Sequence, residues 1–126
     1  MEQILKDKRI LVVEDEESNW FLLRDILEGY SAKVVWAEVG QKAIDMVADG
    51  EHFDLILMDI HLPSIDGLEV TKKIKSLRPD IPVVAQTAFA LDNEIRNCYK
   101  SGCDGHVLKP FTISELTTAI EKVMNR

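Results

Sequence analysis

Residues 55–67 read Leu-Ile-Leu-Met-Asp-Ile-His-Leu-Pro-Ser-Ile-Asp-Gly. The opening run of four apolar residues predicts a short strand buried on both faces, because a strand with one solvated face would alternate. The run ends at Asp59, and Asp66-Gly67 is a turn signal in front of an apolar pattern of helical spacing over residues 68–77. The stretch is therefore a strand–loop–helix unit with a carboxylate where the strand ends.

The same unit recurs along the chain. The apolar patterns predict strands at 10–13, 33–37, 55–58, from 82 onward and at 107–108, and helices at 19–28, 41–48, 68–77, 92–100 and 113–124. Gly29 and Gly102 are expected to end the first and fourth helices. Alternating strands and helices imply a parallel sheet with right-handed crossovers and helices on both faces. We predict one α/β domain over residues 1–126, a doubly wound (βα)5 sandwich whose core spans about 9–124.

Composition excludes several classes of protein. Among 126 residues, 15 Lys and Arg stand against 22 Asp and Glu, which gives a formal net charge of −7 and argues against a direct nucleic-acid partner. No apolar run approaches the roughly 18 residues of a membrane span. The start of the chain has no signal-peptide apolar region, so we expect a cytoplasmic protein without membrane insertion. Cys98 and Cys103 fit no zinc or redox spacing and are expected to be free thiols in or near the core.

Polar residues follow the predicted strands at the points where they end. They are Glu14-Asp15 after the first strand, Glu38 after the second, Asp59 after the third, Thr87 after the fourth and Lys109 after the fifth, with Glu38 the weakest candidate. Because the carboxyl ends of parallel strands share one edge, these side chains should meet in one crevice. Taken singly, each has an ordinary explanation: residues 14–17 could be a solvated turn, and Asp59, Ser18 or Thr112 a helix N-cap. Their joint occurrence in register with the strands favours a site.

The chemistry of such a crevice is that of phosphoryl transfer. Carboxylates in close proximity raise one another's pKa, and a hard divalent cation such as Mg2+, which prefers oxygen ligands, relieves the repulsion. The Lys109 ammonium is a point charge suited to phosphate oxygens, and the Thr87 hydroxyl can donate a hydrogen bond to the same group. An ionised Asp59 is a nucleophile that needs no general base, and aspartyl phosphates are an established outcome.

Four segments together resemble the receiver domain of two-component response regulators. They are residues 10–16 (Ile-Leu-Val-Val-Glu-Asp-Glu), 57–67, Thr87-Ala88 and Lys109-Pro110, within a match from about residue 9 to 124. The run 58–67 most resembles receivers attached to hybrid histidine kinases or acting in phosphorelays. The resemblance implies a flavodoxin-like sheet of strand order 2-1-3-4-5.

The resemblance also implies a role for each residue of the crevice. Asp59 would accept the phosphoryl group from a phosphohistidine of a sensor histidine kinase or a histidine phosphotransfer protein. Mg2+, for which Mn2+ can substitute, would be held by Asp15, Asp59, the backbone carbonyl of His61 and, mainly through water, Glu14.

Around the transferred group, Lys109 would pair with the phosphoryl oxygens and Thr87 would swing toward them. Ala88 would leave room for the group to enter, and the Lys109–Pro110 peptide would be cis. His61 and Phe89 would flank the phosphoryl group and tune its hydrolysis. We expect apolar Phe89 to impede the attacking water, with a role in packing as the alternative.

His106 departs from the family pattern, which has Tyr or Phe at this position. In the family this side chain turns inward when the threonine moves, and downstream protein partners read the change on the face formed by helix 92–100, strand 107–108 and helix 113–124. An imidazole can rotate in the same way, but its ring titrates. The alternative is a half-exposed side chain on an edge strand.

Two other functions compete with a phosphorylation switch. One is a degenerate receiver that only binds partners, against which the intact set of Asp15, Asp59, Thr87 and Lys109 argues. The other is an enzyme of similar fold: nucleotide-binding glycine motifs are absent, and a haloacid-dehalogenase phosphatase would need a second Asp two residues after the first-strand Asp, where Glu17 stands. We expect no enzyme beyond self-phosphorylation and dephosphorylation. A stand-alone receiver and a domain excised from a hybrid kinase are both compatible with the sequence.

Overall fold

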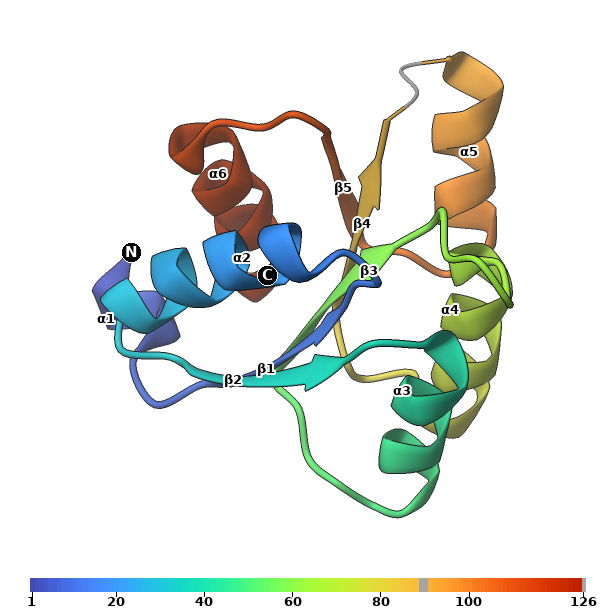
Figure 1. Cartoon of the computed structure of the whole chain (residues 1–126), viewed down its shortest axis with the longest axis horizontal. Coiled ribbons are helices and arrows are strands. Elements are labelled where there is room, and N and C mark those ends of the chain that lie inside the picture. The colour runs from blue at the N-terminus through green and yellow to red at the C-terminus, as the bar shows by residue number, and fades with distance from the viewer. Residues whose placement is uncertain (89–90, 126) are drawn as a thin grey trace.

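A single parallel sheet of five strands forms the centre of the molecule (Figure 1), in a computed structural model that describes residues 1–88 and 91–125. The strands are β1 (Arg9–Val13), β2 (Lys33–Ala37), β3 (Leu55–Asp59), β4 (Val83–Thr87) and β5 (Gly105–Leu108). Their order is β2-β1-β3-β4-β5, and every neighbouring pair is parallel. The predicted doubly wound fold and strand order are therefore confirmed.

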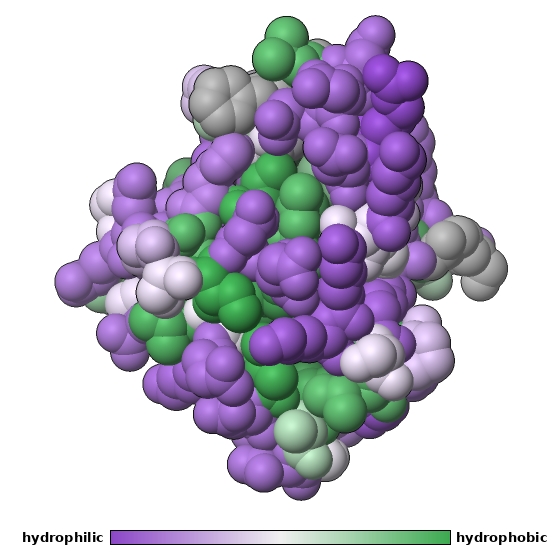
Figure 2. Space-filling model, turned by 90° about the vertical axis from the view of Figure 1, so that its right-hand side faces the viewer, coloured by the Kyte–Doolittle hydropathy of each residue, from purple (hydrophilic) through white to green (hydrophobic). Residues whose placement is uncertain are grey.

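Helices cover both faces of the sheet. They are α1 (Glu2–Leu5), α2 (Glu17–Gly29), α3 (Gly40–Ala48), α4 (Gly67–Leu77), α5 (Asp92–Lys100) and α6 (Ile113–Met124). Helices α2 and α6 lie on one side of the sheet, and α3, α4 and α5 lie on the other (Figure 1). Figure 2 shows the side of α3, α4 and α5, where hydrophilic residues cover most of the surface and hydrophobic ones form a narrow stripe.

The two hydrophobic layers follow from the alternation of side chains along the strands. Leu11 and Ile56 point into the layer under α3 and α4, whereas their neighbours Val12 and Leu57 point into the layer under α2 and α6. All four are fully buried, and β3 and β4 are buried along their whole length. Burial on both faces explains why these strands read as unbroken apolar runs.

Helix α1 was not predicted from the sequence. Four residues are too few to show a helical period, so the segment gives no pattern to detect. Leu5 is nevertheless fully buried, and the Ser31 hydroxyl donates a hydrogen bond to Glu2 at 2.8 Å. The packed core therefore begins before residue 9.

The two glycines predicted to end helices behave differently. Gly102 has the left-handed backbone (φ +107°) after α5, and its N–H donates to the Tyr99 carbonyl, as predicted. Helix α2 ends at Gly29, as predicted, but Gly29 is its last helical residue and not the left-handed residue that follows the helix. Two residues later, Ser31 takes the left-handed conformation (φ +66°) and donates to the Glu28 carbonyl.

The structure shows which of the possible N-cap residues, Asp59, Ser18 and Thr112, caps a helix. Thr112 caps α6 in a capping box with Glu115, each side chain accepting a hydrogen bond of 3.0 Å from the other residue's N–H. Ser18 lies inside α2, and Asp59 is the last residue of β3. Of these three candidates, only Thr112 is an N-cap. Cys98 and Cys103 are buried free thiols, as expected.

Candidate functional site

Three carboxylates meet where the two central strands end. Glu14 and Asp15 follow β1, and Asp59 ends the adjacent β3, at the point where the chain turns away in opposite directions and where open α/β sheets bind ligands. One carboxylate oxygen of each residue lies within 4.8 Å of the others. Glu14 has no exposed surface, Asp59 is 3% exposed, and Asp15 is exposed. The predicted convergence is confirmed for these residues.

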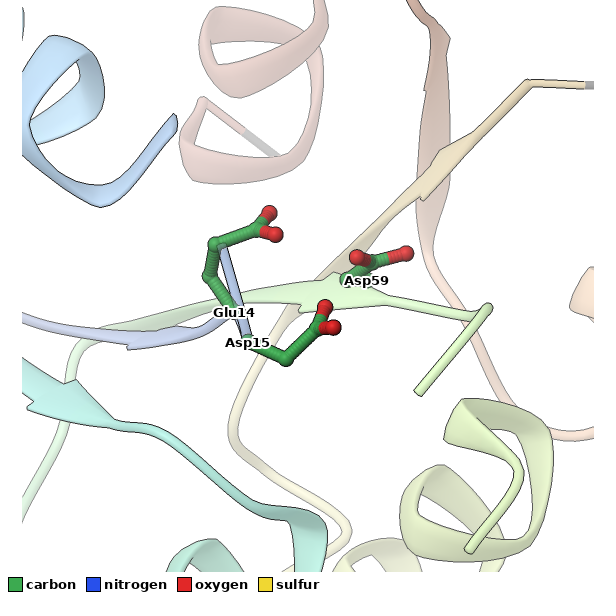
Figure 3. A group of neighbouring side chains, drawn as sticks. All are labelled: Glu14, Asp15 and Asp59. Carbon is green, nitrogen blue, oxygen red and sulfur yellow. The ribbon is translucent and has the colours of Figure 1, made fainter. Parts of the chain in front are cut away.

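The carboxylates have different orientations (Figure 3). Those of Asp15 and Asp59 lie side by side, whereas that of Glu14 extends away from them. Both Glu14 oxygens accept hydrogen bonds from the protein, one from the N–H of Glu16 at 3.2 Å and the other from the amide of Asn19 at 2.5 Å. Glu14 is thus held by local donors, and the Asp15 and Asp59 oxygens are the ones that face a common space.

Lys109 connects the site to the loop after β5. Its Nζ lies 3.1 Å from Asp59 Oδ2 and 3.4 Å from Glu14 Oε2. Burial alone would lower the pKa of Lys109, but the charges and hydrogen bonds of the two carboxylates raise it above its ordinary value. Lys109 is therefore a charged donor at neutral pH, positioned beside an Asp59 oxygen.

Asp59 receives a second hydrogen bond from the backbone. The N–H of His61 donates to Asp59 Oδ1 at 2.9 Å, while Lys109 contacts the other oxygen. Two donors to one carboxylate fix its orientation, because each lone pair that they occupy removes a rotational alternative. The side chain of His61 is exposed, so the loop after β3 contributes its backbone at this point.

The ionised form of Glu14 is disfavoured by its surroundings. Burial raises the pKa of Glu14, and the nearby charge of Asp59 adds to that effect, although the hydrogen bond from Asn19 and the charge of Lys109 oppose it. Among the residues that the structure describes, the cluster holds three carboxylates, two of which are paired with the ammonium of Lys109, so negative charges outnumber positive ones. Oxygen donors of this type, with Asp15 open to solvent, fit Mg2+, which takes one or two carboxylates and keeps several waters.

Several other predicted residues lie beside this cluster. Thr87 is fully buried at the end of β4, and its carbonyl accepts a hydrogen bond of 2.8 Å from the N–H of Lys109. Ala88, Lys109 and Pro110 line a cavity of about 560 Å³ next to the carboxylates. The Lys109–Pro110 peptide is cis, as the resemblance implied. Phe89 lies outside the described residues.

Two predicted residues are not in the acidic cluster. Glu38 forms an exposed ion pair with Lys42 at 3.9 Å. His106 lies partly exposed on β5, where its Nδ1 is 2.8 Å from the Tyr99 hydroxyl and the two rings meet edge to face. His106 also lines a cavity of about 450 Å³ between β5 and α6.

Sequence reasoning missed two polar residues at the site. Asn19 of α2 donates to Glu14, and Gln86 of β4 accepts from the same Asn19 amide at 3.4 Å. Gln86 could have been found from the sequence, because it is a polar residue directly after the apolar run that opens the fourth strand. Asn19 offered a weaker signal, since it lies five residues after Glu14 at the start of a helix, where polar residues are common.

The model of the response regulator receiver domain family matches residues 10–121. The chain belongs to this family. It acts in two-component signalling as the receiver domain of a response regulator. The polar-differentiation response regulator DivK of Brucella ovis is 38% identical over 120 residues, which cover 93% of this chain and 96% of that protein.

Two solved structures of receiver domains, each with a bound partner or ion, are similar to this chain. One is the receiver domain of the sensor histidine kinase PA1611 from Pseudomonas aeruginosa, with a magnesium ion coordinated in the active-site cleft; it has a TM-score of 0.85, is 30% identical and covers 95% of this chain and 99% of its own. The other is the receiver domain of Ssk1 in complex with the histidine phosphotransfer protein Ypd1 of Saccharomyces cerevisiae, with a TM-score of 0.85, 26% identity and coverage of 93% and 88%. In the described part of this receiver, no helix has the length and apolar character that a membrane crossing requires.

Proposed function

We propose that this receiver takes a phosphoryl group onto Asp59 from a phosphohistidine and changes conformation in response. The observation that carries the proposal is the position of Asp59. Its carboxylate is almost fully buried, it is oriented by the N–H of His61 and the ammonium of Lys109, and it shares a space with Asp15. Phosphoryl transfer requires mainly positioning and charge neutralisation, which these groups supply.

The transfer itself exchanges one bond to phosphorus for another. A carboxylate oxygen of Asp59 attacks the phosphorus, the bond from phosphorus to the imidazole nitrogen breaks, and its electron pair stays on that nitrogen, which keeps or takes up a proton. Lys109, 3.1 Å from Asp59 Oδ2, pairs with the oxygens of the transferred group. The cation would be held by Asp15, Asp59 and the His61 carbonyl, with Glu14 acting through water, and would offset phosphoryl charge; Mn2+ has the same preference for oxygen.

The acceptor assignment is tested with a phosphorylated donor protein. A histidine phosphotransfer protein labelled with radioactive phosphate should transfer its label to the wild-type chain in the presence of Mg2+, and transfer to Asp59→Asn should fall to background. Asp45→Asn, on the exposed surface of α3, is a matched control that should accept label normally. Labelling of Asp59→Asn at the wild-type rate would show that another residue is the acceptor.

The donor protein approaches, we propose, through the opening beside α2. The cavity lined by Ala88 and Lys109 reaches Leu22 of α2 and Phe111, which place apolar surface beside the acceptor. Leu22 is 49% exposed. The Ypd1–Ssk1 complex supports a partner of this kind, because there a receiver domain binds a histidine phosphotransfer protein.

A charge at Leu22 tests this docking surface. Leu22→Glu should slow phosphotransfer from a phosphotransfer protein about tenfold or more, because it places a charge in an apolar contact. Leu77→Glu is the matched control, since Leu77 is 47% exposed on α4, outside this cavity. Equal rates for Leu22→Glu and Leu77→Glu would contradict docking at α2.

The chain would not turn over a separate substrate. We propose that its only chemistry is formation and loss of its own aspartyl phosphate, and that phosphorylation changes the face formed by α5, β5 and α6 for a downstream protein partner. Thr87 on β4 and His106 on β5 are the residues through which the change would pass, and β4 and β5 pair directly. Catalytic hydrolysis of a small phosphoester such as p-nitrophenyl phosphate, abolished in Asp59→Asn, would instead favour a phosphatase.

A further inference from the structure

The side chain of Asn19 bridges two strands of the sheet at the acidic site. Its Nδ2 lies 2.5 Å from Glu14 Oε2, after β1, and 3.4 Å from Gln86 Oε1, on β4. An amide nitrogen has two hydrogens, and here each has one acceptor. The two acceptors together fix the rotation of the Asn19 amide, so that a donor rather than the carbonyl faces Glu14.

Gln86 is an unusual residue for its place. It lies in β4 opposite Asp59, its side chain has no exposed surface, and by strand alternation it points to the same side of the sheet as Val84, toward α2 and α6. Its Nε2 has no hydrogen-bond partner within the described ranges. A buried amide with an unsatisfied donor costs free energy that Met or Leu would not cost here. The hydrogen bond that Gln86 Oε1 accepts from Asn19 offsets part of this cost.

The hydrogen bonds from Gln86 through Asn19, which we call the Gln86–Asn19 relay, end at Glu14. Glu14 accepts from Asn19 and Lys109 at one oxygen and from the Glu16 N–H at the other. Without Asn19, the carboxylate would rely more on Lys109, which also contacts Asp59. Asn19 therefore stabilises the Glu14 carboxylate by a hydrogen bond, which leaves Lys109 available to Asp59. It also holds the Glu14 carboxylate away from the space between Asp15 and Asp59 (Figure 3).

From these contacts we infer that Asn19 and Gln86 are positioning residues for the cation site, with Gln86 orienting Asn19 and Asn19 orienting Glu14. The inference rests on the proposed function, because it assumes that a divalent cation binds at Asp15 and Asp59. Partners of metal-site ligands contribute through orientation, and their loss weakens metal affinity by about 10- to 100-fold. A carboxylate that acts through water depends on its partners in the same way.

Mg2+ affinity is the readout that a purely structural role would not change. Tryptophan fluorescence can report it, because the Trp36 indole N–H donates to the Glu14 carbonyl at 2.8 Å and its ring stacks on Trp20 with centroids 5.0 Å apart. The shift of the urea unfolding midpoint with Mg2+ concentration gives a second, independent measure of affinity.

Asn19→Leu has nearly the same shape but no donor, and it should weaken Mg2+ binding about tenfold. Gln86→Met should weaken binding less, and the double variant should bind no more weakly than Asn19→Leu alone, because Gln86 acts through Asn19. Gln41→Leu is the matched control: it removes an amide-to-carboxylate hydrogen bond of 2.9 Å to Asp45 on α3, and its Mg2+ affinity should equal that of the wild type.

Each outcome separates this inference from the function on which it rests. If the wild-type chain does not bind Mg2+ by either measure, both the proposed function and the inference fail. If the wild type binds and Asn19→Leu binds equally well, the proposed function stands and the role of Asn19 is wrong. If the losses of Mg2+ affinity in the two single variants add in the double variant, Gln86 does not act through Asn19. Should Asn19→Leu fail to fold, Asn19→Ala, which removes the same donor, is measured against the same predictions.

Discussion

Glu14 is a buried carboxylate that lies beside a second carboxylate. It is fully buried, close to Asp59, and its pKa is raised by burial above the ordinary value of 4.5. Since the folded pKa is higher than the unfolded one, the native state holds the Glu14 proton more tightly. Ionisation of Glu14 therefore costs no stability below the unfolded pKa, and the full cost is present once the pH has risen above the folded pKa.

Replacement of this carboxylate should stabilise the metal-free protein. Without divalent cations, Glu14→Gln should raise the free energy of unfolding at neutral pH by about 1 kcal/mol, and the gain should vanish as the pH falls below 4.5. Urea unfolding across this pH range, with chelator present, measures it. A Glu14→Gln variant less stable than the wild type at neutral pH would show that the hydrogen bonds to Glu14 outweigh its charge burden.

His106 provides a prediction for the conformational change. In the structure its Nδ1 is 2.8 Å from the Tyr99 hydroxyl, which ties β5 to α5. If His106 takes the place of the usual aromatic switch residue, phosphorylation of Asp59 should break this contact. The NMR resonances of the His106 ring and its nuclear Overhauser contacts to Tyr99 should then change with beryllofluoride, a phosphoryl mimic. An unchanged ring environment in both states would mean that His106 is only a partly exposed residue of an edge strand.

The predictability of individual residues depended on where they lie in the strands. Asp59 and Lys109 could be placed from sequence because each directly follows an apolar run, and Asp15 because it lies one residue further on, since parallel strands end at one edge. Asn19 could not, because its role depends on how the first turn of α2 lies over Glu14 and Gln86. That arrangement is a tertiary contact, which no local pattern encodes.

The start of α4 is the element on which the loop after β3 depends. Gly67 is its first residue, and a Cβ there would overlap the carbonyl oxygen of Asp59 and lie 2.5 Å from the Cα of Ile60. Both atoms belong to the backbone, which cannot turn aside as a side chain could. Asp66 caps the helix by accepting from the N–H of Leu68 at 2.8 Å, as the turn signal indicated.

A methyl group at Gly67 should therefore damage the site. Gly67→Ala is expected to lower the free energy of unfolding by about 2 kcal/mol, within the range for overpacking, and to displace the His61 N–H from Asp59. Chemical denaturation and phosphorylation by acetyl phosphate measure the two effects. Gly29→Ala is the matched control, because nothing lies within 4 Å of a Cβ there and Ala favours the helix. Equal stability of Gly67→Ala and wild type would refute the close approach.

Elements with a clear period were predictable, and short or context-dependent features were not. Helices α5 and α6 begin and end at the predicted residues, since their apolar spacing and flanking signals agree. The four residues of α1 show no period. Helix α2 ends at Gly29, but the left-handed residue beyond it is Ser31, because hydrogen bonds at the helix end, rather than residue type, decide which residue takes that conformation.

On the scale of the whole molecule, the sheet concentrates negative charge at one edge. The net charge of −7 is distributed over the surface, but Glu14, Asp15 and Asp59 place three carboxylates within 4.8 Å. This cluster of carboxylates could be predicted from the sequence, because the apolar runs show where each strand ends and the ends of parallel strands lie at one edge of the sheet. Their exact orientations, such as that of Glu14 away from its neighbours, depend on packing.

A cation that binds this edge should stabilise the whole fold. Because it binds the native state alone, Mg2+ should raise the free energy of unfolding by about 2.7 kcal/mol at a concentration of 100 times its dissociation constant. Thermal or urea unfolding with and without Mg2+ measures the gain, which Asp15→Asn should largely remove. The same gain in Asp15→Asn and wild type would place the cation elsewhere.

The central claim, that Asp59 is the phosphoryl acceptor, is tested most directly by locating the modification. After incubation with acetyl phosphate and Mg2+, borohydride reduces an aspartyl phosphate to homoserine, and peptide mass spectrometry identifies the converted residue. Homoserine is expected at position 59, and none is expected when Mg2+ is omitted or when residue 59 is Asn. Homoserine at another aspartate, or none at all in the wild-type chain with Mg2+, would contradict this claim.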